Sequence, residues 1–193
     1  HYKVLSLDKD TGACTLKVRF DGGFRRKPGL SYSDAEIFVL NGQIKVGKQV
    51  WIEGHYAFIP AGMAIGAIEV PQGAEVLLMF NDSEPSFAET DQHHRLALTD
   101  AFSSVNSYED RPWAPGNLVN PSVASGCLIK VLHYDVMTEA LSFLYCMTPQ
   151  FAQDNISYHD SAEESYHIWG SSWMMQFGEL PTGGYFWRPP YIN

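Results

Sequence analysis

Alternation of apolar and polar residues predicts β-strands along most of the chain. A turn sequence, DKDTG at residues 8–12, separates two such stretches, so residues 2–20 are expected to form a hairpin. Asn41-Gly42 marks a second hairpin turn between apolar segments. No convincing amphipathic helix interrupts this pattern. The sequence therefore predicts an all-β fold.

Three segments recur in the same order, at offsets that drift from 127 to 129 residues. The matched pairs are YKVLSLDKDTGACTLKVRF (2–20) with IKVLHYDVMTEALSFLYCM (129–147), DAEIFVLNG (34–42) with AEESYHIWG (162–170), and GHYAFIP (54–60) with GGYFWRP (183–189). Three matches in register indicate a duplicated unit. We expect an N-terminal barrel at residues 1–80, an irregular linker at 81–120 and a C-terminal barrel at 121–193.

Composition narrows the classes of partner. The formal net charge of −9 argues against nucleic-acid binding, which needs clustered cations. The single basic run, Arg25 to Lys27, is expected to be a solvated loop. No apolar stretch of the sequence is long enough for a transmembrane segment, so the chain is expected to be soluble. The start at His1 without methionine indicates a trimmed chain or the mature form after removal of a targeting segment, and localisation stays open.

The order of motifs resembles a known family. The hairpin with DKDTG, the strand EIFVLNG (36–42), the segment GHYAFIPAG (54–62) and the segment GGYFWRPP (183–190) are similar to the two-barrel (bicupin) proteins related to the ChrR cupin domain. This resemblance implies tandem cupin barrels, each a double-stranded β-helix or jelly roll. In that family, histidine and glutamate before the V-L-x-G strand and a histidine after the P-x-G turn bind iron, zinc or manganese.

The first repeat lacks these ligands. The positions that correspond to them by the resemblance are Ser31, Ala35 and Ile65. Glu36 is one residue out of register, and a one-residue slip on a strand turns a side chain to the opposite face. We therefore predict that the first barrel binds no metal.

The second repeat keeps His159 and Glu163 at the corresponding positions, with Ser157 where a second histidine would stand. They are the candidate metal ligands, and the alternative is a hydrogen-bonded pair in a polar barrel mouth. The next ligand would follow Asn193. His167 shares a strand face with Glu163, but four residues of strand separate them by roughly 13 Å, too far for one metal site. Tyr185, Trp187 and His167 are candidate pocket residues, with core packing favoured for the aromatic pair.

The second repeat ends at Asn193 without the closing strands that the first repeat has after its P-x-G turn. An open barrel edge predicts a covering protein partner or a homo-oligomer. We expect a degenerate bicupin that serves as a non-catalytic accessory or structural subunit, or binds a small molecule, and that has no cofactor. The alternative is a metal-dependent cupin dioxygenase or isomerase that uses a divalent metal in the C-terminal barrel. No other catalytic motif is present.

Overall fold

The computed structural model describes residues 1–154 and 159–191, and Ser157 and Asn193 lie outside this range. The described chain is built from β-strands and two short 3-10 turns, with no α-helix in those residues. Within the same residues no helix has the length and apolar character needed to cross a membrane. The predicted all-β fold is confirmed.

The chain divides into two compact units, residues 1–151 and 152–193. In the first unit the strands are β1 (Tyr2–Leu7), β2 (Cys14–Asp21), β3 (Phe24–Arg26), β4 (Gly29–Leu30), β5 (Ala35–Val46), β6 (Gln49–Ile52), β7 (His55–Ile59), β8 (Ile68–Val70), β9 (Gly73–Phe80), β10 (Ala88–Glu89), β11 (Ser103–Asn106), β12 (Ala114–Pro115), β13 (Cys127–Tyr134) and β14 (Leu141–Met147), with turns η1 (Thr99–Ala101) and η2 (Gly116–Leu118). In the second unit they are β15 (Glu163–Tyr166), β16 (Ser171–Met174), β17 (Gly178–Pro181) and β18 (Tyr185–Arg188).

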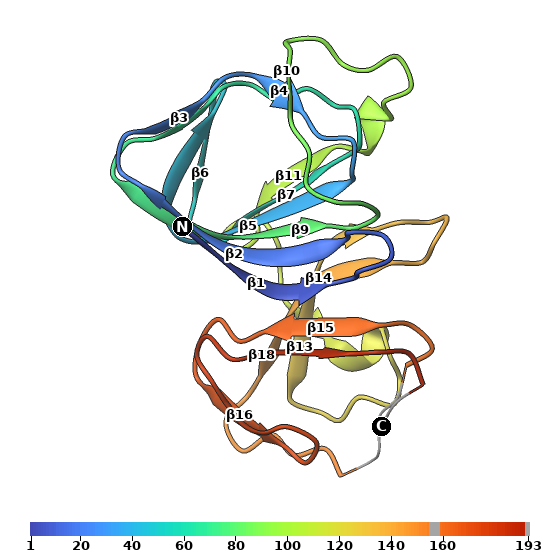
Figure 1. Cartoon of the computed structure of the whole chain (residues 1–193). Helices are drawn as coiled ribbons and strands as arrows, with labels where there is room; N and C mark the ends of the chain where they lie inside the picture. The colour runs from blue at the N-terminus through green and yellow to red at the C-terminus, as the bar shows by residue number, and fades with distance from the viewer. Residues whose placement is uncertain (155–158, 192–193) are drawn as a thin grey trace. The chain divides into compact units, whose positions relative to one another are not determined.

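A jelly-roll barrel forms most of the first unit (Figure 1). Its larger wall has the strand order β1-β2-β9-β5-β7-β11. The long strand β5 leaves this wall after Gly42, where φ is +79°, and continues into a second wall in which it pairs with β6 and β8, while β8 also pairs with β3. One strand thus joins both walls of the barrel.

The barrel interior is apolar. Alternate residues of the strands, which point to one face of a sheet, make up this cluster. Its buried members are Ile37, Val39, Ile44, Val46, Trp51, Ala57, Ile68, Val70, Ala74 and Val76. Val18, Phe20, Ile59, Ile65 and Leu78 pack against them. Burial of this set accounts for the alternating pattern from which the strands were predicted.

Residues 81–120, expected as an irregular linker, contribute strands to the first unit. β11 extends the larger wall by pairing with β7, β10 pairs with β4, and β12 pairs with β13. Figure 1 shows β4 and β10 side by side at one end of the barrel. The proposed domain boundaries at 80 and 120 stay a prediction.

The hairpins β1–β2 and β13–β14 have the same register. Tyr2 pairs with Val18 in the first hairpin and Ile129 with Tyr145 in the second, an offset of 127 on both strands. Each ladder shifts at one equivalent place, after Val4 and after Val131. Both turns are closed by an aspartate, Asp8 or Asp135, whose amide donates to an alanine carbonyl at 2.9 Å. The repeated sequence therefore forms a repeated local structure.

The second unit consists, in its described residues, of the strand pairs β15–β18 and β16–β17. β15 and β18 pair in the register of β5 and β7: Glu163 lies opposite Arg188, as Ala35 lies opposite Ile59. The end of this pair is joined by two backbone hydrogen bonds of His167, which donates to Gly184 at 2.8 Å and accepts from Gly183 at 2.7 Å.

Candidate functional site

The first barrel has no metal-binding set of side chains at the three positions that correspond, by the family resemblance, to metal ligands. Ser31 Oγ lies 3.3 Å from Ser86 Oγ and accepts a hydrogen bond from the amide of Ser33 at 3.1 Å. Ala35 opens β5, and the backbone of Ile65 exchanges hydrogen bonds with Gly29. Alanine and isoleucine side chains have no donor atoms for a metal. These residues do not fit a divalent cation.

Glu36 points away from the barrel interior, as the register argument predicted. Its neighbour Ile37 belongs to the apolar core, whereas Glu36 Oε2 accepts a 2.6 Å hydrogen bond from the Tyr56 hydroxyl. Glu36 Oε1 accepts a second one, 2.9 Å long, from Asn81 Nδ2. Burial, with the nearby Glu36 charge, raises the pKa of Tyr56 above its ordinary value. This carboxylate therefore has a structural role in the sheet.

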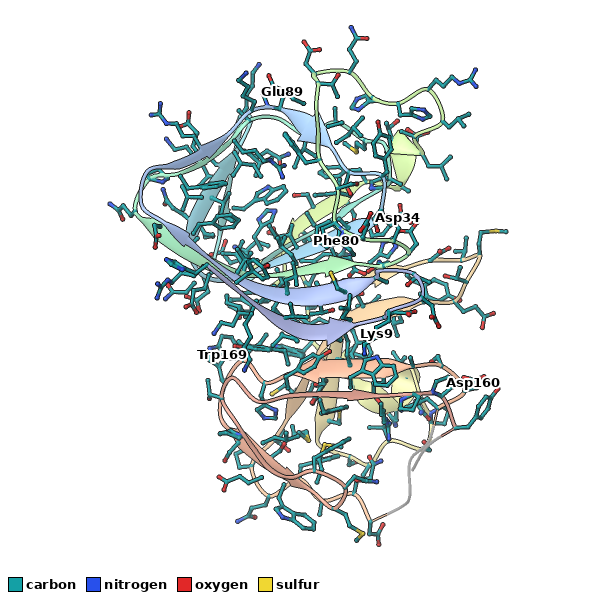
Figure 2. All side chains as sticks on the ribbon, in the orientation of Figure 1. Lys9, Asp34, Phe80, Glu89, Asp160 and Trp169 are labelled. Atoms are coloured by element: carbon teal, nitrogen blue, oxygen red, sulfur yellow. The ribbon has the colours of Figure 1, made fainter. Side chains whose placement is uncertain are left out.

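A segment around residues 82–97 closes one end of the barrel. Asp82 accepts hydrogen bonds from Ser33 Oγ and from the amide of Asp34, whose own carboxylate accepts from the amide of Ala61 at 2.6 Å. His93 Nδ1 accepts from the amide of Ala64 at 3.1 Å. The barrel end that bears the P-x-G turn is therefore covered. Figure 2 labels Asp34 at the start of β5, near Phe80.

Phe87 and Arg26 meet at this covered end. Arg26 Cζ lies 4.6 Å from the centre of the Phe87 ring, within range of a cation–π interaction. The expectation of a solvated loop for the basic run was wrong at Arg26, because residues 24–26 form β3 and this side chain is partly buried. The sequence did not reveal the role of Arg26, because a run of three basic residues indicated a loop. In a strand, neighbouring side chains point to opposite faces, so one cation of the run can be partly buried while the next is exposed.

In the second unit, Glu163 contacts both His159 and Arg188. His159 Nε2 lies 3.4 Å from Glu163 Oε2, and the same oxygen accepts a 2.6 Å hydrogen bond from Arg188 Nε and forms an ion pair with its Nη2. The Arg188 side chain is 9% exposed. A guanidinium in this position competes with any cation for the carboxylate. No group of three histidine, cysteine or acidic side chains suited to a metal occurs among residues 1–154 and 159–191.

Of the candidate pocket residues, Tyr185 and Trp187 lie on the opposite face of β15–β18 from Glu163. Residues directly opposite in an antiparallel pair share a face, so Trp187 lies with Glu164 and Tyr185 with Tyr166. The Tyr185 hydroxyl donates to Glu164 Oε2 at 2.5 Å, and Trp187 is 50% exposed. Desolvation lowers the pKa of His167. The structure thus separates the aromatic pair from His159 and Glu163.

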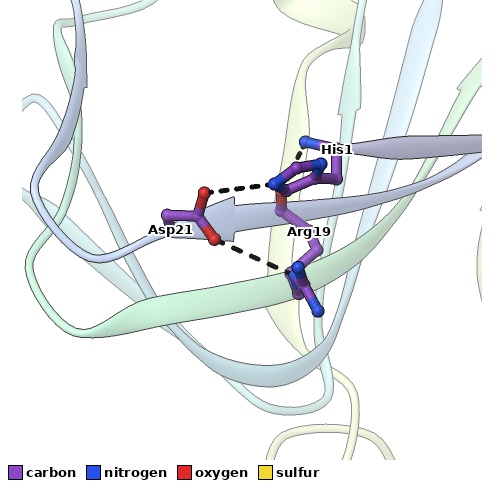
Figure 3. A network of polar contacts seen from close by, with 3 residues as sticks. All are labelled: His1, Arg19 and Asp21. Carbon is purple, nitrogen blue, oxygen red and sulfur yellow. Dashed lines mark hydrogen bonds and ion pairs between the residues drawn. The ribbon is translucent and has the colours of Figure 1, made fainter.

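Two hollows of the first unit contain charged side chains. The larger, about 470 Å³, lies along β1 and β2 and contains Arg19, whose Nε is 3.9 Å from Asp21 Oδ1; His1 Nε2 is 3.5 Å from Asp21 Oδ2 (Figure 3). The smaller, about 250 Å³, is lined by Arg25, Arg26, Lys27, Pro28, Ala67, Ile68 and Glu69. Of these two hollows, only the second contains a partly buried cation without a counter-charge among the residues that the structure describes.

The jelly-roll barrel and its strand order define a cupin fold, and solved structures with this fold resemble the chain over almost its whole length. A candidate dioxygenase from Nostoc punctiforme matches 98% of the chain with a TM-score of 0.87 and 24% identity, and the chain spans 65% of that protein. A glyoxylate-induced protein from Pseudomonas aeruginosa matches 99% of it (TM-score 0.68, 13% identity, 72% of that chain). Oxalate decarboxylase from Bacillus subtilis matches 92% of it (TM-score 0.55, 12% identity, 62% of that chain).

The family follows from residues 2–191, which match the family model described as a domain of unknown function, DUF4437. The chain belongs to the DUF4437 family. No curated protein matches the sequence significantly.

Proposed function

We propose that this chain is a degenerate two-barrel cupin that acts without catalysis, as a small-molecule-binding or accessory subunit. The observation that supports this proposal most directly is the chemistry at Ser31, Ala35 and Ile65. The family resemblance places metal ligands at these positions, and two of the three side chains have no donor atom. Cupin folds carry many activities, so the function has to be argued from the site.

Two further features support the proposal. The apolar cluster, Trp51 among its members, fills the barrel interior, and the segment around residues 82–97 covers the barrel end that bears the P-x-G turn. The equal registers of β1–β2 and β13–β14 support a duplicated unit, from which the first copy has lost its metal chemistry. A barrel packed in this way contributes a rigid scaffold and surface sites.

The alternative is a metal-dependent cupin dioxygenase or isomerase that uses the second repeat. The 3.4 Å contact between His159 and Glu163 favours it, because a histidine and a carboxylate are common metal ligands. The Arg188 guanidinium on the same carboxylate opposes it.

Metal analysis of the purified full-length protein separates the two proposals. We expect iron, zinc and manganese to be well below one ion per chain, and the melting temperature to be unchanged when each ion is added after chelation. His159→Ala serves as the matched variant. A stoichiometric ion that is lost in His159→Ala would overturn the non-catalytic proposal and support the enzyme.

A partner protein or a second copy of the chain belongs to the same proposal. Large aromatic side chains are exposed on the second unit, including Trp169 and Trp173 at 61% and 69%. Exposed apolar groups of this size favour association. Analytical ultracentrifugation of the full-length protein is expected to show a mass above that of one chain, and a monomer at all concentrations would remove this part of the proposal.

A further inference from the structure

Arg26 faces the interior of the first barrel. In the β3–β8 pair, Arg26 lies opposite Ile68 and Phe24 lies opposite Val70, and residues directly opposite share a face. Ile68 and Val70 are members of the apolar core, and the Phe24 ring packs on Phe20 with centroids 4.7 Å apart. Strand β3 therefore directs a guanidinium towards the apolar side of the wall.

This guanidinium has no counter-charge within the described residues. Its Nε is buried without a hydrogen-bond partner, and none of the ion pairs described in those residues includes it. Burial lowers the pKa of Arg26. Arg19 lies beside Asp21, Lys27 is paired with Glu89 at 2.6 Å, and Arg188 is paired with Glu163. Arg26 differs from these cations, and a partly buried cation without an anion is costly for the fold.

The surroundings of Arg26 are arranged as a small site. The Phe87 ring lies over the guanidinium, and the short β10–β4 pairing holds the segment that carries it: Ala88 pairs with Leu30 and Glu89 with Gly29. Figure 2 labels Glu89 at this end of the barrel. Next to Arg26 is the hollow of about 250 Å³, whose walls include Pro28, Ala67 and Ile68.

The charges around this hollow favour a small anion. Arg25, Arg26 and Lys27 line it together with a single carboxylate, Glu69. Glu69 is opposite Arg25 in the β3–β8 pair and opposite Lys45 in the β5–β8 pair, so cations flank it on two strands. The site is locally positive on a chain with a net charge of −9. One available guanidinium and apolar walls suit a monoanion with an apolar body better than a highly charged phosphate.

We propose that Arg26 binds the carboxylate of a small aromatic or aliphatic acid, with the apolar part of the ligand against Ala67, Ile68 and the Phe87 segment. A planar guanidinium matches a carboxylate with two parallel hydrogen bonds. The inference rests on the proposed function, because it names the ligand class of a barrel that binds without a metal. In this barrel a protein cation replaces the metal as the group that receives the anion.

Calorimetric titration of the full-length protein with benzoate, in chelator-treated buffer, tests the inference. Benzamide, which has the same shape without the charge, is the matched ligand control. Lys9→Gln is the matched protein control, because Lys9 is an exposed cation that is not among the residues lining the hollow. We expect benzoate to bind, benzamide to bind at least about tenfold more weakly, and Arg26→Gln to lower benzoate affinity by about tenfold or more.

Lys9→Gln is expected to stay within about twofold of the wild type. Arg26→Lys is expected to retain part of the affinity, because it keeps the charge and loses the second hydrogen bond. Circular dichroism shows whether each variant is folded. No heat of binding with benzoate, equal binding of benzamide, or equal affinity of Arg26→Gln would each overturn the inference. Failure of the proposed function itself would appear separately, as a stoichiometric metal in the untreated protein.

Discussion

The Tyr56 hydroxyl donates a 2.6 Å hydrogen bond to Glu36 Oε2, and both side chains are buried on one face of the paired strands β7 and β5. Glu36 stands one residue after Ala35, the position at which the family resemblance expects a metal ligand. Because successive residues of a strand point to opposite faces, that single step moves the carboxylate from the barrel interior to the other side of the sheet. On that side, the Glu36 carboxylate accepts hydrogen bonds from Tyr56 and Asn81.

Tyr56→Phe is expected to lower the free energy of unfolding by about 1–3 kcal/mol at pH 7, because it leaves a buried carboxylate oxygen without its donor. Chemical denaturation of both proteins measures this difference. Ser104→Ala is a suitable control, because it removes a hydroxyl that bonds a histidine, His55, at 2.7 Å. A loss in Tyr56→Phe no larger than in this control would contradict a special role for the Glu36 contact.

The same pair predicts a dependence on alkaline pH. The pKa of Tyr56 is raised in the folded protein by burial and by Glu36, whereas in the unfolded chain it is about 10. A raised pKa gives stability that is complete below about pH 10 and is lost as the pH rises towards the folded value. The stability difference between wild type and Tyr56→Phe should therefore narrow by up to about 1.4 kcal/mol per pH unit above pH 10. A constant difference from pH 8 to pH 11 would contradict this.

Arg26→Met should bind no carboxylate and yet be at least as stable as the wild type. The substitution removes a partly buried cation whose Nε has no partner, while the unbranched methionine side chain can fill the same space. Loss of the Phe87 interaction offsets part of this gain, so the expected increase is up to about 1 kcal/mol. Differential scanning calorimetry measures it. A clear loss of stability would show that Arg26 serves the fold.

The sequence contained the strand pattern, the hairpin turns and the repeat, because these depend on neighbouring residues and on fixed spacings. The prediction that Glu36 turns away from the interior was confirmed for the same reason: it needs only the period of a strand. The meeting of Arg26 with Phe87 could not be predicted, since these residues are brought together by the β10–β4 pairing of two residues on each strand. The pairing of Arg188 with Glu163 likewise depends on strand register across 25 residues.

Gly29→Ala tests the cover over the barrel end. A Cβ atom at this position would lie 2.1 Å from Phe87 Cε2 and 2.6 Å from the carbonyl oxygen of Ala88, so β10 would have to move away from β4. We expect a loss of about 1–3 kcal/mol in the free energy of unfolding and faster proteolysis within residues 82–97. The double variant Gly29→Ala with Phe87→Ala should recover only part of the loss, because the Ala88 carbonyl remains. Full recovery would show that the β10 backbone is free to move.

Glu163 and Arg188 form the central ion pair of the second unit, and a double-mutant cycle measures their coupling. Arg188 is nearly buried while Glu163 is about a third exposed, so each single variant leaves the other charge in a partly dry site. We expect the double variant Glu163→Gln/Arg188→Met to have a lower free energy of unfolding than the wild type. Its loss should be smaller than the sum of the losses of the two single variants, which gives a coupling of about 1–3 kcal/mol. Denaturation of the four proteins in metal-free buffer gives the four values, and the same series with added zinc repeats the cycle. Zinc that stabilises the wild type but not Glu163→Gln, and that weakens the coupling by displacing Arg188, would show that the carboxylate is a metal ligand, and it would restore the enzyme as the better account of this chain.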